Sequence, residues 1–120
     1  MVHQSVTELI IGASFEMHRI LGYGFLEKVY QRSMQIELLS RGCKCEIEPE
    51  IKVIYKGEEA GFYRADLLVC DCVIVELKTA KNYVAEDEAQ LLNELKATGI
   101  KVGLLINFGR TKVEFKRMVF

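Results

Sequence analysis

The sequence has little proline and no long apolar segment, and both shortages narrow the class of protein. Pro49 is the only proline, and no low-complexity tract interrupts the 120 residues, so nothing marks a linker between domains. The longest apolar runs are far too short to cross a bilayer, and residues 1–5 lack the basic region that begins a signal peptide. We therefore expect one cytoplasmic domain spanning residues 1–120, with no membrane partner.

Charge of one sign is also lacking. Sixteen Lys and Arg residues balance seventeen Asp and Glu residues, which gives a formal net charge of −1. This balance argues against a protein coated in basic surface to bind nucleic acid, although it leaves room for a local basic patch. Half of the residues are hydrophobic and 28% are charged, which is typical of a folded globular domain.

The cysteines lack the spacing of a structural zinc site. The four form two C-x-C pairs, Cys43 with Cys45 and Cys70 with Cys72, whereas zinc knuckles usually use C-x-x-C. Both pairs fall in expected strands, where residues two apart share a face. We expect reduced cysteines, as is usual in a cytosolic protein, and treat a zinc or disulfide role as the weaker alternative.

Hydrophobic spacing divides the chain into helices and strands. Helices are expected at residues 6–21, 25–40 and 84–98, and strands at residues 43–47, 51–55, 62–70, 73–79, 101–107 and 112–119. The order α-α-β-β-β-β-α-β-β favours an α/β sandwich in which helices flank a mixed sheet. Residues 73–106 should form a right-handed βαβ crossover between two parallel strands.

Charged residues interrupt two of the apolar strands. Asp66 lies in one strand on the same face as Arg64, and Glu76 lies in the next strand on the same face as Lys78. Burying a charge is costly unless it is paired or coordinated. These positions therefore indicate a site rather than an ordinary solvated surface.

The loop between the two strands decides whether the acids meet. Paired residues of a hairpin have a constant sum, so pairing of Val69 with Val73 would place Asp66 opposite Glu76 on one face. A two-residue turn at residues 71–72 would place the acids on opposite faces. We predict an odd-numbered loop or a bulge, because the site needs both acids together.

Paired acids of this kind indicate a divalent cation. Two ionised carboxylates side by side repel each other, which raises one pKa unless a cation lies between them. Mg²⁺ binds one or two carboxylates together with water and phosphate oxygens. Lys78 could then orient or deprotonate the attacking water, or hold the scissile phosphate. Asp66 followed by Glu76-x-Lys78 thus favours phosphodiester cleavage with Mg²⁺ or Mn²⁺; the alternative is a salt bridge in which Lys78 offsets both acids.

Glu27 is a further candidate acid. On a helical wheel it falls on the stripe that holds Tyr30, Met34 and Leu38, which the spacing predicts to face the core. An inward glutamate needs a partner, and either a metal ion or Lys78 would serve. The alternative is that Glu27 occupies the first helical turn only because the helix macrodipole favours an acid there.

Six segments resemble a known family. Residues 24–30 (GFLEKVY) fit the signature of the GxxExxY protein family, a branch of the PD-(D/E)XK nuclease superfamily. The other matching segments are residues 55–57 (YKG), 63–66 (YRAD), 75–78 (VELK), 88–92 (EAQLL) and 103–109 (GLLINFG). Together they are specific, whereas any one alone would be weak. The resemblance covers nearly the whole chain and implies a restriction-endonuclease-like sandwich with a central mixed β-sheet.

The resemblance also implies roles for individual residues. Asp66 and Glu76 resemble the metal-binding acids of the superfamily, and Lys78 resembles its catalytic lysine. Glu27 resembles the extra metal-binding acid that several nuclease branches supply from a helix. The implied metal site is therefore Asp66, Glu76 and Glu27.

A glutamine on the third helix completes the resembling set. Gln90 resembles the catalytic-site glutamine that many of these enzymes place at the edge of the site. Members often carry a tyrosine soon after that glutamine, at the position where this chain has Glu94. The departure bears on contact with the substrate rather than on the metal chemistry.

Two functions from different classes follow as hypotheses. The first is a Mg²⁺- or Mn²⁺-dependent nuclease that cleaves DNA, with RNA as the less favoured alternative substrate, and with specificity supplied by a homodimer or an unidentified protein partner. The second is a nuclease-fold module that binds nucleic acid or a protein without cleaving anything. The intact Asp66, Glu76 and Lys78 favour the enzyme. The near-neutral net charge, and Glu94 in place of the tyrosine, leave the non-catalytic module as an alternative.

Overall fold

The structure, a computed structural model, describes residues 3–80 and 85–120 of the chain. The helices are α1 (Gln4–Leu21), α2 (Glu27–Ser40) and α3 (Ala85–Thr98), and the strands are β1 (Cys45–Ile47), β2 (Glu50–Tyr55), β3 (Glu58–Arg64), β4 (Leu67–Val69), β5 (Val73–Lys78), β6 (Val102–Asn107) and β7 (Glu114–Val119). The three expected helices are present, and the expected start of the third at residue 84 lies outside the described residues. Among the described helices, none combines the length and apolar character needed to cross a bilayer.

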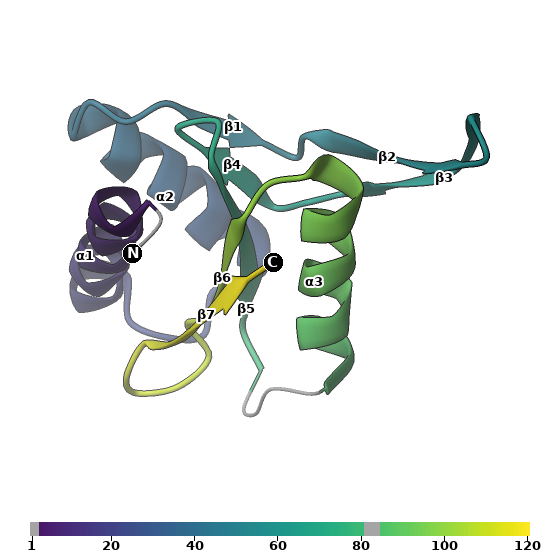
Figure 1. Cartoon of the computed structure of the whole chain (residues 1–120). Helices are drawn as coiled ribbons and strands as arrows, with labels where there is room; N and C mark the ends of the chain where they lie inside the picture. Colours follow the sequence, from purple (N-terminus) through teal and green to yellow (C-terminus); the bar gives the residue numbers. More distant parts are fainter. Residues whose placement is uncertain (1–2, 81–84) are drawn as a thin grey trace.

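A mixed sheet forms the centre of the molecule. Its strand order is β1-β4-β5-β6-β7, with β5 and β6 parallel and the other neighbours antiparallel. Figure 1 shows α1 and α2 on one side of this sheet and α3, which connects β5 to β6, on the other. Parallel neighbours need a crossover of this kind, because the chain must return to the starting end of the sheet before the second strand begins. The expected α/β sandwich with a mixed sheet is confirmed.

The segment expected as one long strand, residues 62–70, is two strands in different sheets. The Ala65 N–H still donates to the Pro49 carbonyl at 3.3 Å, in register with the β2–β3 pairs, but Pro49 has no N–H to donate in return, so the ladder stops after Arg64. The central sheet resumes only after Asp66. The expectation that Arg64 and Asp66 share a face of one strand is therefore wrong, and Arg64 lies exposed in the smaller sheet.

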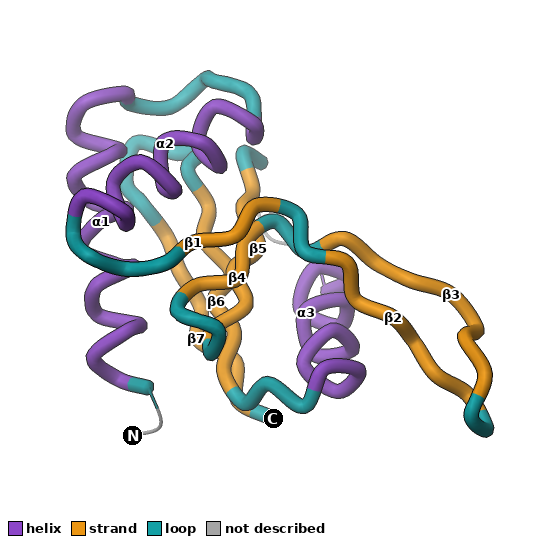
Figure 2. The backbone as a smooth tube through the Cα atoms, turned by 90° about the horizontal axis from the view of Figure 1, so that it is seen from above, coloured by secondary structure: helices purple, strands orange, loops and turns teal. Residues whose placement is uncertain are grey.

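That smaller sheet is the β2–β3 hairpin, which projects away from the rest of the fold beside α3 (Figure 2). Its two-residue turn, Lys56 and Gly57, has positive φ at both positions, the conformation that matches the twist of a hairpin. The strands expected at residues 51–55 and 62–70 left a longer connection between them, so β3 begins earlier than predicted. Ile51 is the only buried residue of this hairpin, and it packs against α3 and the central sheet.

Two hydrophobic clusters of different size lie on the two faces of the central sheet. The larger lies between the sheet and the α1–α2 pair, and it includes the Tyr30 ring, stacked on Phe108 with centroids 4.6 Å apart. The Tyr30 hydroxyl donates to the Gly22 carbonyl at 2.6 Å, so this tyrosine is a core residue. The smaller cluster lies under α3 and contains Ile51, Ala65, Ile74, Leu91, Leu95 and Leu105.

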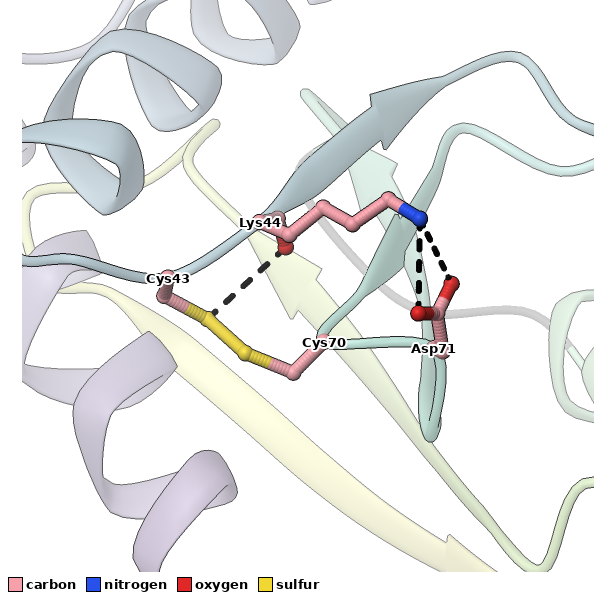
Figure 3. The surroundings of a disulfide bond; sticks show 4 residues. All are labelled: Cys43, Lys44, Cys70 and Asp71. Carbon is pink, nitrogen blue, oxygen red and sulfur yellow. Dashed lines mark hydrogen bonds and ion pairs between the residues drawn. A yellow bond between two sulfur atoms is a disulfide. The ribbon is translucent and has the colours of Figure 1, made fainter.

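The cysteines depart from expectation. Cys43 and Cys70 form a disulfide whose Cα atoms lie 5.9 Å apart (Figure 3). Pairing of β1 with β4 brings these positions together, and the separation lies in the usual range for a disulfide. The Cys70 N–H also donates to the Lys44 carbonyl at 2.8 Å. Cys45 and Cys72 are free thiols. The expectation of four reduced cysteines is therefore wrong.

Candidate functional site

The β4–β5 hairpin brings Asp66 and Glu76 together. Its register pairs Val69 with Val73, and residues 70–72 form the connection, so the expected odd-numbered loop is confirmed. Continued one step beyond the last pair of the ladder, the same register places Asp66 opposite Glu76. The two acids therefore meet at the end of the hairpin that lies away from its loop.

Asp66 is held by three other segments of the chain. Its carboxylate oxygen Oδ2 accepts a hydrogen bond from the Leu77 N–H on β5 at 2.7 Å. Its backbone carbonyl accepts one from the Gln31 amide of α2 at 2.9 Å, and a second from the Glu48 N–H at 3.0 Å. The half-buried side chain is therefore fixed where α2, β4 and β5 converge.

Glu76 is the buried acid of β5. Only 4% of it is exposed, and its oxygen Oε1 has no hydrogen-bond partner among the described residues. Burial raises the pKa of this carboxyl well above its usual range, and its contacts with Glu94 and Asp66 raise the pKa further. An acid in this environment favours a proton or a cation over the free ionised form.

Glu94 is a third acid at the site, and the sequence interpretation gave it no role. It lies on α3 with no exposed surface, and it contacts Glu76 across the space between helix and sheet. Gln90 donates to its oxygen Oε2 at 3.4 Å, while its oxygen Oε1 has no partner among the described residues. Burial is the largest cause of its raised pKa. The position between Leu91 and Leu95, on the apolar stripe of the helix, was the signal that could have identified it.

Lys78 pairs with a fourth acidic residue rather than with the buried acids. Its ammonium nitrogen Nζ lies 3.3 Å from Oδ1 of Asp87, in the first turn of α3. Partial burial would lower the pKa of Lys78, but the hydrogen bond and charge of Asp87 outweigh it, and the net shift is upward. The alternative of a salt bridge between Lys78 and the acids Asp66 and Glu76 is therefore wrong, because the ion pair of Lys78 is with Asp87.

The chain after β5 is braced by the end of β6. The Phe108 N–H donates to the Lys78 carbonyl at 2.9 Å, and the buried Asn107 amide donates to the Ala80 carbonyl at 2.7 Å. A Cβ atom at Gly109 would lie 2.4 Å from the Thr79 backbone, so only glycine allows this approach. These contacts fix the exit of β5 and hence the position from which Lys78 projects.

Glu27 lies at the site but not in the core. As the first residue of α2 it is exposed, which contradicts the expectation of an inward-facing glutamate. It lines a small cavity of about 110 Å³ together with Asp66, Gln31, Glu48 and Lys28. Burial, followed by the charge of Asp66, raises its pKa. Glu27 therefore lies in the first turn of α2, where the helix macrodipole favours an acid, and it also lines the same cavity as Asp66.

The donor set fits a hard divalent cation, although the side chains are not already closed around one. Within residues 3–80 and 85–120, no three Asp, Glu, His or Cys side chains converge as a complete set of metal ligands. In the same part of the chain, no ion pair engages Asp66, Glu76 or Glu94. Mg²⁺ and Mn²⁺ prefer oxygen ligands, and Mg²⁺ needs only one or two carboxylates beside water and phosphate. The unpartnered Oε1 of Glu76, beside Asp66, meets that requirement.

The chain is similar to known proteins in sequence and in fold. The sequence model of the PD-(D/E)XK nuclease superfamily matches residues 4–118. The crystal structure of SSO0001 is similar, with a TM-score of 0.57 and 18% sequence identity over 96% of this chain, and an identity this low shows likeness of fold alone. The match covers 57% of SSO0001, so this chain spans little more than half the length of that protein. No curated protein gives a significant match.

The superfamily model covers all the elements that build the site, from the start of α1 into β7. The Asp66, Glu76 and Lys78 positions fall within it, on the β4–β5 hairpin where the acids meet. This chain belongs to the PD-(D/E)XK nuclease superfamily.

Proposed function

We propose that this protein is a divalent-metal-dependent nuclease that hydrolyses phosphodiester bonds in DNA. The observation that carries the proposal is the pair formed by Asp66 and Glu76, two adjacent acids that form no ion pair with any lysine or arginine of the described residues. A structural ion-pair network would place a cation of the protein there. Membership of the nuclease superfamily supports the same conclusion.

Asp66 and Glu76 are the residues that would hold Mg²⁺ or Mn²⁺. Glu27 would contribute from the outer side, because it lines the cavity next to Asp66. When bound, such an ion supplies positive charge to the scissile phosphate and lowers the pKa of a water molecule. The protein's own part is to keep the two carboxylates fixed, through the Leu77 and Gln31 contacts of Asp66.

Lys78 would act as an ammonium group. Because Asp87 raises its pKa, the side chain keeps its proton near neutral pH and is a poor base. Its chemistry at the site is therefore to donate hydrogen bonds and positive charge to a phosphate oxygen, where charge accumulates during hydrolysis. Asp87 holds the ammonium at the mouth of the site while leaving its other protons free to donate.

Glu94 and Gln90 would act through Glu76. Glu94 contacts the Glu76 carboxyl from the α3 side, and Gln90 donates to Glu94 from the exposed edge of the same helix. Without a cation, two buried carboxyls in contact are most stable when one carries a proton. Cation binding would release that proton, and both carboxyl groups would then be ionised.

A cleavage assay tests the proposal. Purified protein would be incubated with single-stranded, duplex, flapped and branched DNA, and with RNA, in Mg²⁺, in Mn²⁺ and in chelator. We expect metal-dependent DNA cleavage that falls below detection in Glu76→Ala and by about 10²–10³-fold in Lys78→Ala. Glu86→Ala, a matched control at an exposed position on α3, should cleave normally. An absence of cleavage on every substrate, without Mn²⁺ binding, would instead favour the non-catalytic module.

A further inference from the structure

A groove lies between the β2–β3 hairpin and the second half of α3. Its volume is about 500 Å³, within the roughly 300–1,000 Å³ typical of small-molecule sites. Figures 1 and 2 show the hairpin passing beside the end of α3 and continuing beyond it. The lining residues come from both elements and are Val53, Ile54, Tyr63, Asn93, Lys96 and Ala97.

Three of these residues carry chemistry that suits one class of ligand. Tyr63 is 42% exposed and offers an aromatic ring, Asn93 offers an amide, and Lys96 offers an ammonium group. In the described part of the chain, no hydrogen bond or ion pair engages the side chain of Asn93 or Lys96. Proteins that bind unpaired nucleotides combine the same three groups, since a ring stacks on the base, an amide reads its edge and a cation meets the phosphate.

The groove lies further along α3 than Gln90, one of the α3 residues at the candidate site. Residues three or four apart are neighbours on a helix surface, so Asn93 follows Gln90 on the same side, next to Glu94. Along the helix axis, Asn93 lies about 4.5 Å and Lys96 about 9 Å beyond Gln90. A stacked strand rises about 3.4 Å per nucleotide along its axis, so these separations correspond to only a few nucleotides. A strand held at Asp66 and Glu76 can therefore reach the groove.

We propose that this groove binds an unpaired nucleotide of the substrate strand, with the base against Tyr63 and the phosphate near Lys96. The choice of ligand rests on the proposed nuclease function. Bases inside a duplex are stacked on each other and cannot present a face to Tyr63. The groove therefore selects single-stranded or frayed DNA over blunt duplex DNA, and it makes Tyr63, Asn93 and Lys96 specificity residues.

Binding without cleavage tests this directly. The full chain in chelator would be titrated into fluorescein-labelled single-stranded DNA, the matching duplex, and single-stranded RNA, with fluorescence anisotropy as the readout. The variants are Tyr63→Leu, Tyr63→Phe and Lys96→Gln. Phe62→Leu is the matched control for the ring, because the neighbouring residue of a strand points to the opposite face. Lys112→Gln, at an exposed lysine outside the groove, is the control for charge.

We expect Tyr63→Leu to weaken single-stranded binding about ten-fold while leaving duplex binding unchanged. Tyr63→Phe should bind as the wild type does, because it keeps the ring. Lys96→Gln should weaken binding and reduce the slope of log affinity against log salt by about 0.7. Equal losses in Phe62→Leu and Tyr63→Leu would overturn the proposal. So would single-stranded affinity that neither Tyr63→Leu nor Lys96→Gln changes, with thermal melting confirming that each variant is folded.

The two proposals can fail separately. A wild-type protein that never cleaves, yet binds single strands through Tyr63, would remove the nuclease and keep the groove. An active wild-type protein whose Tyr63 and Lys96 variants bind normally would keep the nuclease and remove the groove. Stronger binding to RNA than to DNA through the same residues would keep the groove and change the substrate of the nuclease.

Discussion

The two faces of the central sheet bury different kinds of side chain, although they share the same strands. On β5, Val73, Val75 and Leu77 enter the large cluster under α1 and α2, while Ile74 enters the small cluster under α3. Glu76 follows Ile74 on that second face, where a hydrophobic residue would otherwise continue the core. The face under α1 and α2 is therefore apolar and stabilises the fold, whereas the face under α3 buries acids in place of some apolar side chains.

The difference shows how a small domain can hold a costly site. Buried carboxyl groups without partners destabilise the fold, because they lose water and gain no hydrogen bond in return. The stacked Tyr30 and Phe108 rings, on the far face, belong to the larger apolar cluster that offsets this cost. We expect substitutions on the two faces to have opposite effects on stability.

The largest expected effect is on the apolar face. Phe108→Ala should lower the free energy of unfolding by about 3–5 kcal/mol, because Phe108 is fully buried and its ring stacks on Tyr30. Urea denaturation followed by circular dichroism would measure the change. Phe120→Ala, at an exposed phenylalanine, is the control and should stay within about 0.5 kcal/mol. A loss below about 1 kcal/mol in Phe108→Ala would remove the contrast between the faces.

On the acidic face the sign should reverse. Glu94→Leu should raise the free energy of unfolding of the metal-free protein by about 1–3 kcal/mol, because it removes a buried carboxyl oxygen that has no partner among the described residues. Glu86→Leu, at an exposed glutamate on the same helix, should change little. Thermal and urea unfolding in chelator would measure both. Destabilisation by Glu94→Leu would mean that this carboxyl stabilises the fold.

The smallest effect, expressed per pH unit, is the dependence of the free energy of unfolding on pH. The pKa of Glu76 and of Glu94 is raised in the folded protein, chiefly by burial, above the ordinary value of 4.5. The folded state then binds the proton more tightly, so this contribution is complete below pH 4.5 and is lost as pH rises toward the folded pKa. In chelator, we expect the free energy of unfolding to fall between pH 5 and 8, by at most about 1.4 kcal/mol per pH unit for one proton.

Variants identify the source of that slope. The double variant Glu76→Gln with Glu94→Gln should show a shallower dependence than the wild type, measured by urea unfolding at the two ends of the pH range. A single Glu86→Gln change should leave the slope as it is. Identical slopes in all three proteins would assign the dependence to other groups and contradict the account of the buried pair.

Local patterns were sufficient to predict most of the fold and the meeting of Asp66 with Glu76. Helical spacing predicts the three helices, and alternation along β4 and β5 predicts which residues share a face. Parity then predicts the loop, because only an odd-numbered connection lets Asp66 face Glu76, and the register has Val69 opposite Val73. These features follow from residues close together in the sequence.

The features that sequence reasoning missed depend on contacts between distant segments. The break at Ala65 arises because Pro49, which lies opposite Ala65 in the β2–β3 register, has no N–H to complete the ladder, and the apolar run of residues 62–70 does not show which segment it pairs with. Lys78 finds Asp87 only after α3 has crossed the sheet. Cys43 meets Cys70 only once β1 pairs with β4. Partner choice of this kind is set by the tertiary fold rather than by the period of the pattern.

The measurement that tests the central claim most directly is the calorimetric titration of Mn²⁺ into the purified protein. The claim is that Asp66 and Glu76 hold a divalent cation. We expect saturable binding in the wild type, at least about ten-fold weaker binding in Glu76→Gln, and unchanged binding in Glu86→Gln. No binding by the wild type, or equal affinity in Glu76→Gln, would contradict the account.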